Sequence, residues 1–447
     1  MTMAMRHKRA ADLVETSELT RLGRVLVAFL PPIAVLNPIL PHIGPVASFT
    51  AYSVLFFAYG VFHLRRRPPS GIRRLVLVLC LPVLAIALWT VITQFGTPVV
   101  FTEAVVVAGG IFIVLGLIAL PSSRDTMRAI LAGWLLASLA TTVLAAIELT
   151  TGRHFGPNYL DANPTATKTG VVTVFFNPNN YAAFLCLAIP LLLAGATLTT
   201  RRWLRLTYYA TAVVSVPLTV ATSSRFGLAA LVLGGSIWLM LRLRSHIAQA
   251  FMLAFALFAV ILTLTLLQGR AAGDISSAAR SSGYVISVMG LDIPSDSSLL
   301  ARWNLMLNGL DMIPHTPFGS GPGGYELAAQ AQGTTRNTFG MINPHNGAIE
   351  FITQYGIILG AIAALLTITL FIVSVRANNT YGKGTPERAL ASATVCVIAM
   401  LPLILGMHST FLDVPHEWIG FATFAAVGAY LQARRATIAV PDGSTNV

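Results

Sequence analysis

The sequence predicts an all-α polytopic membrane protein with about 12 transmembrane helices and one large extracytoplasmic loop, residues 268–345, between helices 9 and 10. Of its 447 residues, 55% are hydrophobic and only 10% are charged, with a mean hydropathy of +0.73. Soluble domains carry about a quarter charged residues, so this composition excludes them. The chain also contains apolar runs long enough to cross a bilayer, which must be helical because lipid cannot satisfy an open backbone.

The first two predicted spans, residues 24–41 and 43–63, are separated by Pro38 and Pro41, which interrupt the helical pattern. Charged or turn-forming residues bound most of the later runs. We expect the ten later spans at residues 75–95, 100–120, 128–149, 170–197, 204–222, 226–242, 246–267, 346–375, 388–410 and 415–433.

The positive charge follows this topology. The net charge of +12 could indicate a nucleic-acid partner, but all except seven of the 29 Lys and Arg lie in the termini and at alternate span ends. The positive-inside rule therefore predicts cytoplasmic tails at 1–23 and 434–447 around a transmembrane domain at 24–433. Basic clusters beside anionic lipid explain the charge without nucleic acid. The seven outward cations are Arg153, Lys168, Arg225, Arg270, Arg280, Arg302 and Arg336.

The outward connection at 268–345 is expected to be functional, because structureless loops of this length are uncommon. Its apolar spacing from Ser298 to Leu310 predicts an amphipathic helix that could lie on the membrane surface. Arg302 belongs to this helix, where it could face a site or be solvated. In the glycine-dense stretch 319–324, we favour an ordinary turn over a phosphate cradle, because it follows no strand.

Arg225 is the outward cation that most needs an explanation. It lies at the start of a predicted span, where a cation opposes the helix dipole and, at bilayer depth, costs roughly 2.5–3.5 kcal/mol. An anion held between Arg225 and the free amides of the helix end would remove both penalties. We favour a diphosphate site, and the alternative is an arginine that snorkels to the surface.

His345 is the main candidate for chemistry. Pro344 sets the chain before a long span and Asn346 is a favourable N-cap, so His345 lies at the positive end of a helix. This position should favour neutral imidazole, the form needed in a general base. Glu350, about a turn further on, could orient His345, counter an arginine or simply pair inside the bundle. Asn179, at another span, is a further candidate for support.

No metal or cofactor is predicted. Four polar residues of the last outward loop could bind a metal in principle, but we favour ordinary loop polarity. They are His408, Asp413, His416 and Glu417. The three cysteines lie inside spans and are expected to be inert packing residues. Intramembrane acids are candidates for function by default, and two more lie at the same level, Glu103 and Glu148.

Together, these segments resemble the O-antigen ligase and polymerase superfamily, membrane glycosyltransferases of the GT-C type. The resemblance covers about residues 170–375, and its motifs occur in the family's order. The segments that match are Phe176–Asn180 with Pro190, Ser224-Arg225, Arg302-Trp303 leading to Pro317–Gly321, and Pro344-His345-Asn346 followed by Gly356 and Gly360.

The sequence departs from the family pattern at two points. Gly356 and Gly360 are one residue further apart than usual, which should shift helix packing slightly without touching the chemistry. Phe226 stands where the family often has glycine, which leaves the pose of Arg225 open.

The resemblance implies transfer of a saccharide from a polyprenyl-diphosphate-linked donor to a hydroxyl of a glycan or glycolipid, with inversion, on the extracytoplasmic face of a bacterial plasma membrane. His345 would be the general base, and Arg225 and Arg302 would hold the diphosphate in place of a metal. The implied partners are the donor, the acceptor and membrane lipids.

Several alternatives remain. Within the family we rank ligation first, repeat-unit polymerisation second, and protein O-oligosaccharyl transfer is also open. An alternative of another class is a flippase or transporter of lipid-linked sugars. A transporter should carry polar groups near mid-bilayer in repeated halves, whereas the ionisable groups here cluster at the outer boundary.

Overall fold

The computed structural model describes residues 19–40, 42–43, 46–64, 70–94, 96–157, 170–243, 246–266, 284–288, 291–295, 297–332 and 336–438. This part of the chain is almost entirely helical, which confirms the predicted class. Eight of its helices are long and apolar enough to cross a membrane, and three shorter apolar helices accompany them. The strands form two antiparallel hairpins, β1 (His42–Ile43) with β2 (Val46–Ala47) and β3 (Tyr284–Val288) with β4 (Leu291–Ser295).

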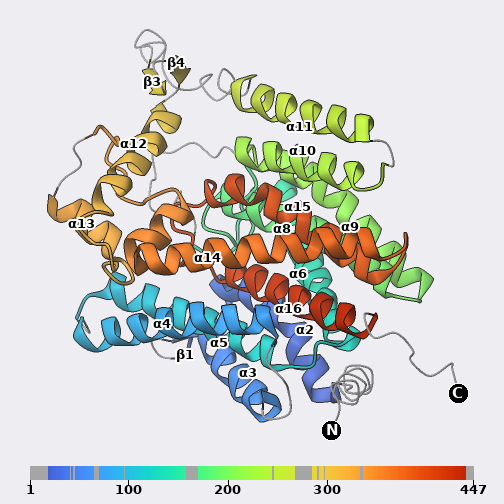
Figure 1. The fold of residues 1–447 in the computed structure, drawn as a ribbon. Helices are drawn as coiled ribbons and strands as arrows, with labels where there is room; N and C mark the ends of the chain where they lie inside the picture. Colours follow the sequence, from blue (N-terminus) through green and yellow to red (C-terminus); the bar gives the residue numbers. More distant parts are fainter. Residues whose placement is uncertain are drawn as a thin grey trace, which may run out of the picture.

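The helices run across the view of Figure 1 as a bundle, with α10 and α11 side by side along one edge and α3 at the opposite edge. They are α2 (Arg21–Leu36), α3 (Ser48–Leu64), α4 (Gly71–Thr93), α5 (Pro98–Ala119), α6 (Arg124–Thr151), α8 (Pro178–Leu198), α9 (Arg202–Ala221), α10 (Arg225–Met240), α11 (His246–Leu266), α12 (Ser297–Met312), α13 (Gly324–Gln332), α14 (Gly347–Thr380), α15 (Pro386–Leu405) and α16 (Pro415–Ile438), with a 3-10 turn η1 (Asn37–Ile39) after α2.

The connections predicted to face outwards meet at one end of the bundle, which we name the site end. It is the end at which α5, α8, α10, α14 and α16 begin, and α12 and α13 lie there in Figure 1. The main chain of Val171 donates to the Ala221 carbonyl, so the segment before α8 lies against the α9–α10 hairpin. A Cβ on Gly321 would approach Thr90 at the end of α4, so the large loop also packs here.

The cations predicted to be cytoplasmic gather at the opposite end. Arg124, at the start of α6, pairs with Glu387, at the start of α15, at 2.9 Å. Arg434 of α16 lies 3.6 Å from the same carboxylate. These contacts tie three helices together at that end. The two ends therefore differ in charge as the sequence predicts.

The predicted span at 170–197 is wrong at its start, because helix α8 begins only at Pro178. Asn177 has an extended backbone and its side chain accepts a hydrogen bond from the Asn180 amide, which caps the helix. The irregular segment 170–176 is instead held by Glu148 of α6, whose carboxylate accepts hydrogen bonds from the Val172 and Thr173 amides.

Helix α12 confirms the amphipathic helix expected from Ser298 to Leu310. It does not only rest on the membrane surface: Ala301, Leu305 and Gly309 are buried, and a Cβ on Gly309 would meet Ile349 of α14. The large loop therefore packs its helix onto the first turns of α14.

Helix α14 is broken at Gly356, which has φ 87° and ψ 166°. The loop after α12 fits into this break, where Ser320 and Gly321 donate to the Thr353 and Gln354 carbonyls and Ile357 donates to the Pro317 carbonyl. A Cβ on Gly356 would lie 2.7 Å from the Pro317 oxygen. Gly356 therefore opens the backbone for the loop, a role that its spacing from Gly360 did not predict.

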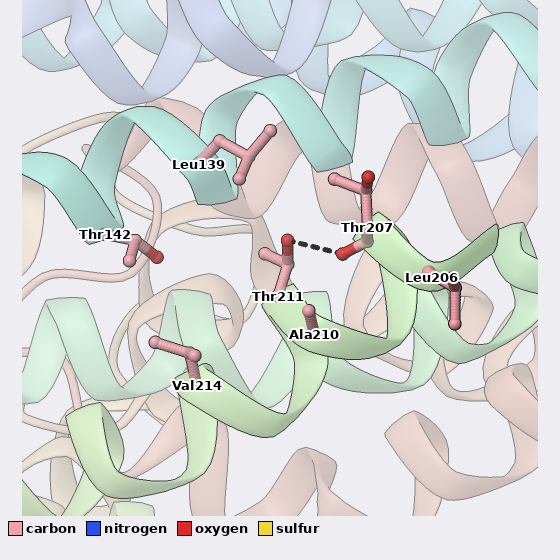
Figure 2. Close-up of a pocket in the computed structure, with 7 residues that line it drawn as sticks. All are labelled: Leu139, Thr142, Leu206, Thr207, Ala210, Thr211 and Val214. Atoms are coloured by element: carbon pink, nitrogen blue, oxygen red, sulfur yellow. Dashed lines mark hydrogen bonds between the residues drawn. The ribbon is translucent and has the colours of Figure 1, made fainter. Parts of the chain in front are cut away.

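Figure 2 shows a pocket on the side of the bundle between α6 and α9. Its lining is uncharged, and two of its hydroxyls bond to their own helix: Thr211 donates to the Thr207 carbonyl and Thr207 to the Trp203 carbonyl. It offers no group for a diphosphate. Its residues are Leu139, Thr142, Leu206, Thr207, Ala210, Thr211 and Val214.

Candidate functional site

Arg225 is the first residue of α10, as the sequence predicts. The hairpin before it is tight: Ser223 has φ 57°, and the buried hydroxyl of Ser224 caps the helix by accepting from the Gly227 amide at 3.2 Å. A Cβ on Gly227 would lie 2.7 Å from Ala182, so this glycine lets α10 approach α8 closely. The half-buried Arg225 side chain is thus fixed at the site end by a capped, closely packed helix start.

Arg302 reaches the same corner from α12. Its guanidinium carbon lies 5.4 Å from the centre of the Phe226 ring, and Nη1 donates to the Gly406 carbonyl at 2.7 Å. A cation over an aromatic face is attracted by the ring quadrupole. Phe226, the departure from the family pattern, therefore contacts the second arginine with its ring face, one residue after Arg225.

His345 lies between Arg302 and the start of α14. Its amide donates to the Ser409 carbonyl at 3.0 Å, and Asn346 caps α14 by accepting from the Ala348 and Ile349 amides. Burial and the nearby Arg302 guanidinium lower the pKa of His345 to about 3. The expected neutral imidazole is therefore supported, although burial rather than a helix dipole is the main cause. Its Nδ1 is buried with no hydrogen-bond partner in the described chain.

The α15–α16 loop, residues 406–414, supports both groups. It contributes the carbonyls of Gly406 and Ser409 that hold Arg302 and His345. Glu350 fixes the loop in turn, because its carboxylate accepts hydrogen bonds from the Phe411 and Leu412 amides. Glu350 was expected to orient His345, counter an arginine or pair inside the bundle. The structure supports the first role in an indirect form, because Glu350 positions the loop that hydrogen-bonds to His345 and Arg302.

Asn180, not the expected Asn179, makes the buried contact at the start of α8. Its Oδ1 lies 3.0 Å from Nδ1 of His408, whose Nε2 lies 2.8 Å from Oε1 of Glu417. Asn179 is half-buried on the first turn. Ordinary loop polarity is a wrong description of this region, because His408, His416 and Glu417 are all buried. The capping Asn177 gave no signal for this, because its bond fixes the Asn180 amide and not the Asn180 side chain.

A group of buried carboxyls lies beside this loop. Glu103 of α5, Glu326 of α13 and Asp413 interact electrostatically, and both carboxylate oxygens of Glu326 lack a hydrogen-bond partner among the described residues. Burial and the neighbouring Asp413 raise the pKa of Glu326 to about 7. Burial also raises the pKa of Asp413 to about 6. Burial thus raises the pKa of both acids at the site end towards neutral pH.

The glycine-dense stretch is an ordinary turn, as favoured. The amides of Gly319, Ser320, Gly321 and Gly324 all donate to main-chain carbonyls. A phosphate cradle needs such amides to point at the ligand. Among the described residues, the cationic candidates for an anion are therefore the arginines at the site end.

Residues 210–364 match the family model described as O-antigen ligase. This match supports the resemblance to the O-antigen ligase and polymerase superfamily. The matched segment includes Arg225, Arg302, His345 and the Gly356 break. As an O-antigen ligase-like protein it is an integral membrane protein of a group with glycosyltransferase-type activity on lipid-linked saccharides. No curated protein matches the chain.

Proposed function

We propose that this O-antigen ligase-like protein transfers a saccharide from a polyprenyl-diphosphate donor to a hydroxyl of a glycan or glycolipid. One observation carries the proposal: Arg302 lies over the ring of Phe226, the residue after Arg225, and within electrostatic reach of His345, whose pKa is lowered. Arg225 and Arg302 would bind the diphosphate and stabilise its growing charge as the sugar–oxygen bond breaks. His345 would accept the proton of the attacking hydroxyl.

Donor binding would also tune the base. The Arg302 charge is one reason why the pKa of His345 is low. A diphosphate bound to Arg302 would neutralise that charge and raise the basicity of the imidazole. His345 would then become an effective base only when the donor is in place. It would not remove the proton of an acceptor hydroxyl while no donor is bound.

The proposal includes a topology of 12 spans with both termini in the cytoplasm of a bacterial cell and the 268–345 loop outside. In this topology the spans would be the eight long and three shorter apolar helices together with α16. The arginine-rich end would face the cytoplasm according to the positive-inside rule. The site end would then face the extracytoplasmic side, where polyprenyl-linked sugars are consumed.

One observation favours a second candidate, a transporter of lipid-linked sugars. Glu326 and Asp413 are buried acids that titrate near neutral pH, a property useful in coupling transport to protons. They lie at the site end rather than in repeated broken helices at mid-bilayer, which the transporter alternative expects.

Transfer by the purified protein tests the proposal. Labelled polyprenyl-diphosphate saccharide should be consumed in detergent or vesicles when glycolipid, repeat-unit or peptide acceptors are supplied separately, and the acceptor that is labelled assigns the class within the family. Brief EDTA treatment should leave turnover unchanged, because arginines hold the diphosphate. Donor movement across vesicles without a covalent product would instead establish the transporter.

A further inference from the structure

Three buried polar side chains converge behind the α15–α16 loop. His408 lies in this loop, while His416 and Glu417 begin α16, and their relative exposures are 0%, 3% and 5%. One ligand atom from each lies within 4.8 Å of the other two. The proposed transfer reaction assigns no role to these three side chains.

Asn180 fixes the tautomers of both histidines. Its side-chain oxygen faces Nδ1 of His408 at 3.0 Å, and an amide oxygen can only accept, so Nδ1 carries a proton and, in the neutral ring, Nε2 is bare. The main chain of Asn180 also hydrogen-bonds to the His416 ring, whose Nε2 is buried without a partner in the described chain. Each ring, when neutral, therefore presents a bare Nε2.

Both bare nitrogens point at one carboxylate oxygen. Nε2 of His408 lies 2.8 Å and Nε2 of His416 lies 3.5 Å from Oε1 of Glu417. Three lone-pair donors this close repel one another unless a positive charge lies between them. A single proton would satisfy only one pair and leave the other nitrogen unsatisfied, at a cost of about 1–3 kcal/mol. A metal ion would satisfy all three.

We propose that His408, His416 and Glu417 bind a divalent transition metal of the zinc class. Two imidazoles and one carboxylate are a zinc ligand set, and ligands of a tetrahedral zinc site lie about 3.4 Å apart, between the two separations seen here. Histidine ligands commonly donate their other N–H to a carbonyl, which is the part that Asn180 plays. Magnesium and calcium prefer oxygen ligands, so the imidazoles disfavour them.

The metal would hold the loop in place rather than act on the donor. The loop that carries His408 also supplies the carbonyls that hold Arg302 and His345. This consequence rests on the proposed function, but metal binding does not. The transfer step itself would still need no metal.

Metal content of the full-length protein tests the site without any sugar donor. Protein purified from zinc-supplemented cells should contain about one zinc per chain by elemental analysis, and its cobalt-substituted form should show the absorption bands of a low-symmetry N/O site. His416→Ala should lose the metal. Asn180→Ala should weaken zinc binding about 10–100-fold, since it removes the outer partner of His408.

Two further variants keep the test sharp. His416→Cys restores a zinc ligand and should recover the metal if His416→Ala merely unfolded the protein. His315→Ala alters an exposed histidine outside the cluster and should keep full zinc content. Wild-type protein that neither contains nor binds zinc, or an equal zinc content in His416→Ala, would overturn the proposal whatever the outcome of the transfer assay.

Discussion

His345 has an unusual backbone for a histidine, with φ 48°. Few side chains adopt this left-handed region without cost, and asparagine is among those that do so most readily. The conformation turns the chain so that the His345 amide reaches Ser409 while Asn346 starts α14. Any test of its chemistry must keep this conformation.

Replacement of His345 should therefore separate chemistry from structure. His345→Asn tolerates the left-handed backbone but provides no base, and we expect a loss of roughly 10²–10⁴-fold in turnover with donor affinity nearly unchanged. His345→Ala should show the same loss with some added instability. Single-turnover rates and donor binding on folded protein check this, and wild-type turnover in either variant would disprove the general base.

The two arginines should differ from His345 in their kinetic signature. Arg225→Ala and Arg302→Ala should weaken donor binding and slow turnover, because a diphosphate is charged before the reaction and gains charge during it. Arg225→Lys should recover only part of the activity, since a point charge cannot reproduce a planar fork.

Phe226 offers a matched control for this pair. Phe226→Leu keeps an apolar side chain but removes the ring face under Arg302, so we expect a several-fold loss in donor affinity. In a double-mutant cycle, adding Phe226→Leu to the Arg302→Ala variant should then change donor affinity very little. Additive losses would show that the ring does not act through Arg302.

Among the elements, the broken helix α14 is the most sensitive. Gly356→Ala places a methyl group 2.7 Å from the Pro317 oxygen in a backbone region that alanine rarely adopts. We expect a loss of about 1–3 kcal/mol from backbone strain, with a further loss from the clash and reduced turnover because the loop no longer seats. Gly235→Ala, a glycine inside α10 with open space around it, is the control and should leave turnover unchanged without lowering thermal stability.

The outer acids make stability depend on pH with a predictable sign. The pKa of Glu326 is about 7 in the folded protein and near its ordinary value when unfolded, so the folded state holds the proton more tightly. This group's contribution is fully present below about pH 4.5 and is lost as the pH rises through 7.

Glu326→Gln should remove that dependence. At pH 8 the variant should be more stable than the wild type by up to about 3 kcal/mol, and near pH 4.5 the two should converge. Thermal unfolding across this pH range provides the measurement, with Glu387→Gln at the opposite end as a comparison that should instead destabilise because it breaks the contacts with Arg124 and Tyr430. A pH profile identical to wild type would contradict the assignment.

Periodicity and motif order were sufficient to predict most helices and the amphipathic helix in the large loop, and they singled out Arg225, Arg302 and His345 as candidates. They could not reveal that Gly356 breaks α14, because a glycine at helical spacing resembles an ordinary packing site. Glu350 and Asn180 act on the α15–α16 loop, more than 60 and 220 residues away in sequence. Such long-range contacts leave no local pattern, and so the loop's supporting role emerged only from the fold.

At the scale of the whole molecule, the two ends of the bundle should label differently in cells. The described cysteines are all buried, so the background is low. Gln330→Cys on α13 should react with a membrane-impermeant maleimide in intact cells, while Gly382→Cys before α15 should react only after lysis, both being exposed. The reverse pattern would invert the proposed topology and place the site in the cytoplasm. Ser282, another natural choice for labelling the loop, lies outside the described residues.

The position of the α15–α16 loop along the chain also bears on biogenesis. Arg225, Arg302 and His345 leave the ribosome before residues 406–414, whose carbonyls later hold two of them. Since chains are made from the amino terminus, the nascent protein can carry every reactive side chain and still lack the scaffold that aligns them. If the proposed function holds, insertion of α15 and α16 is the step that makes the protein active. A chain that stalls before this step would not act on lipid-linked sugars.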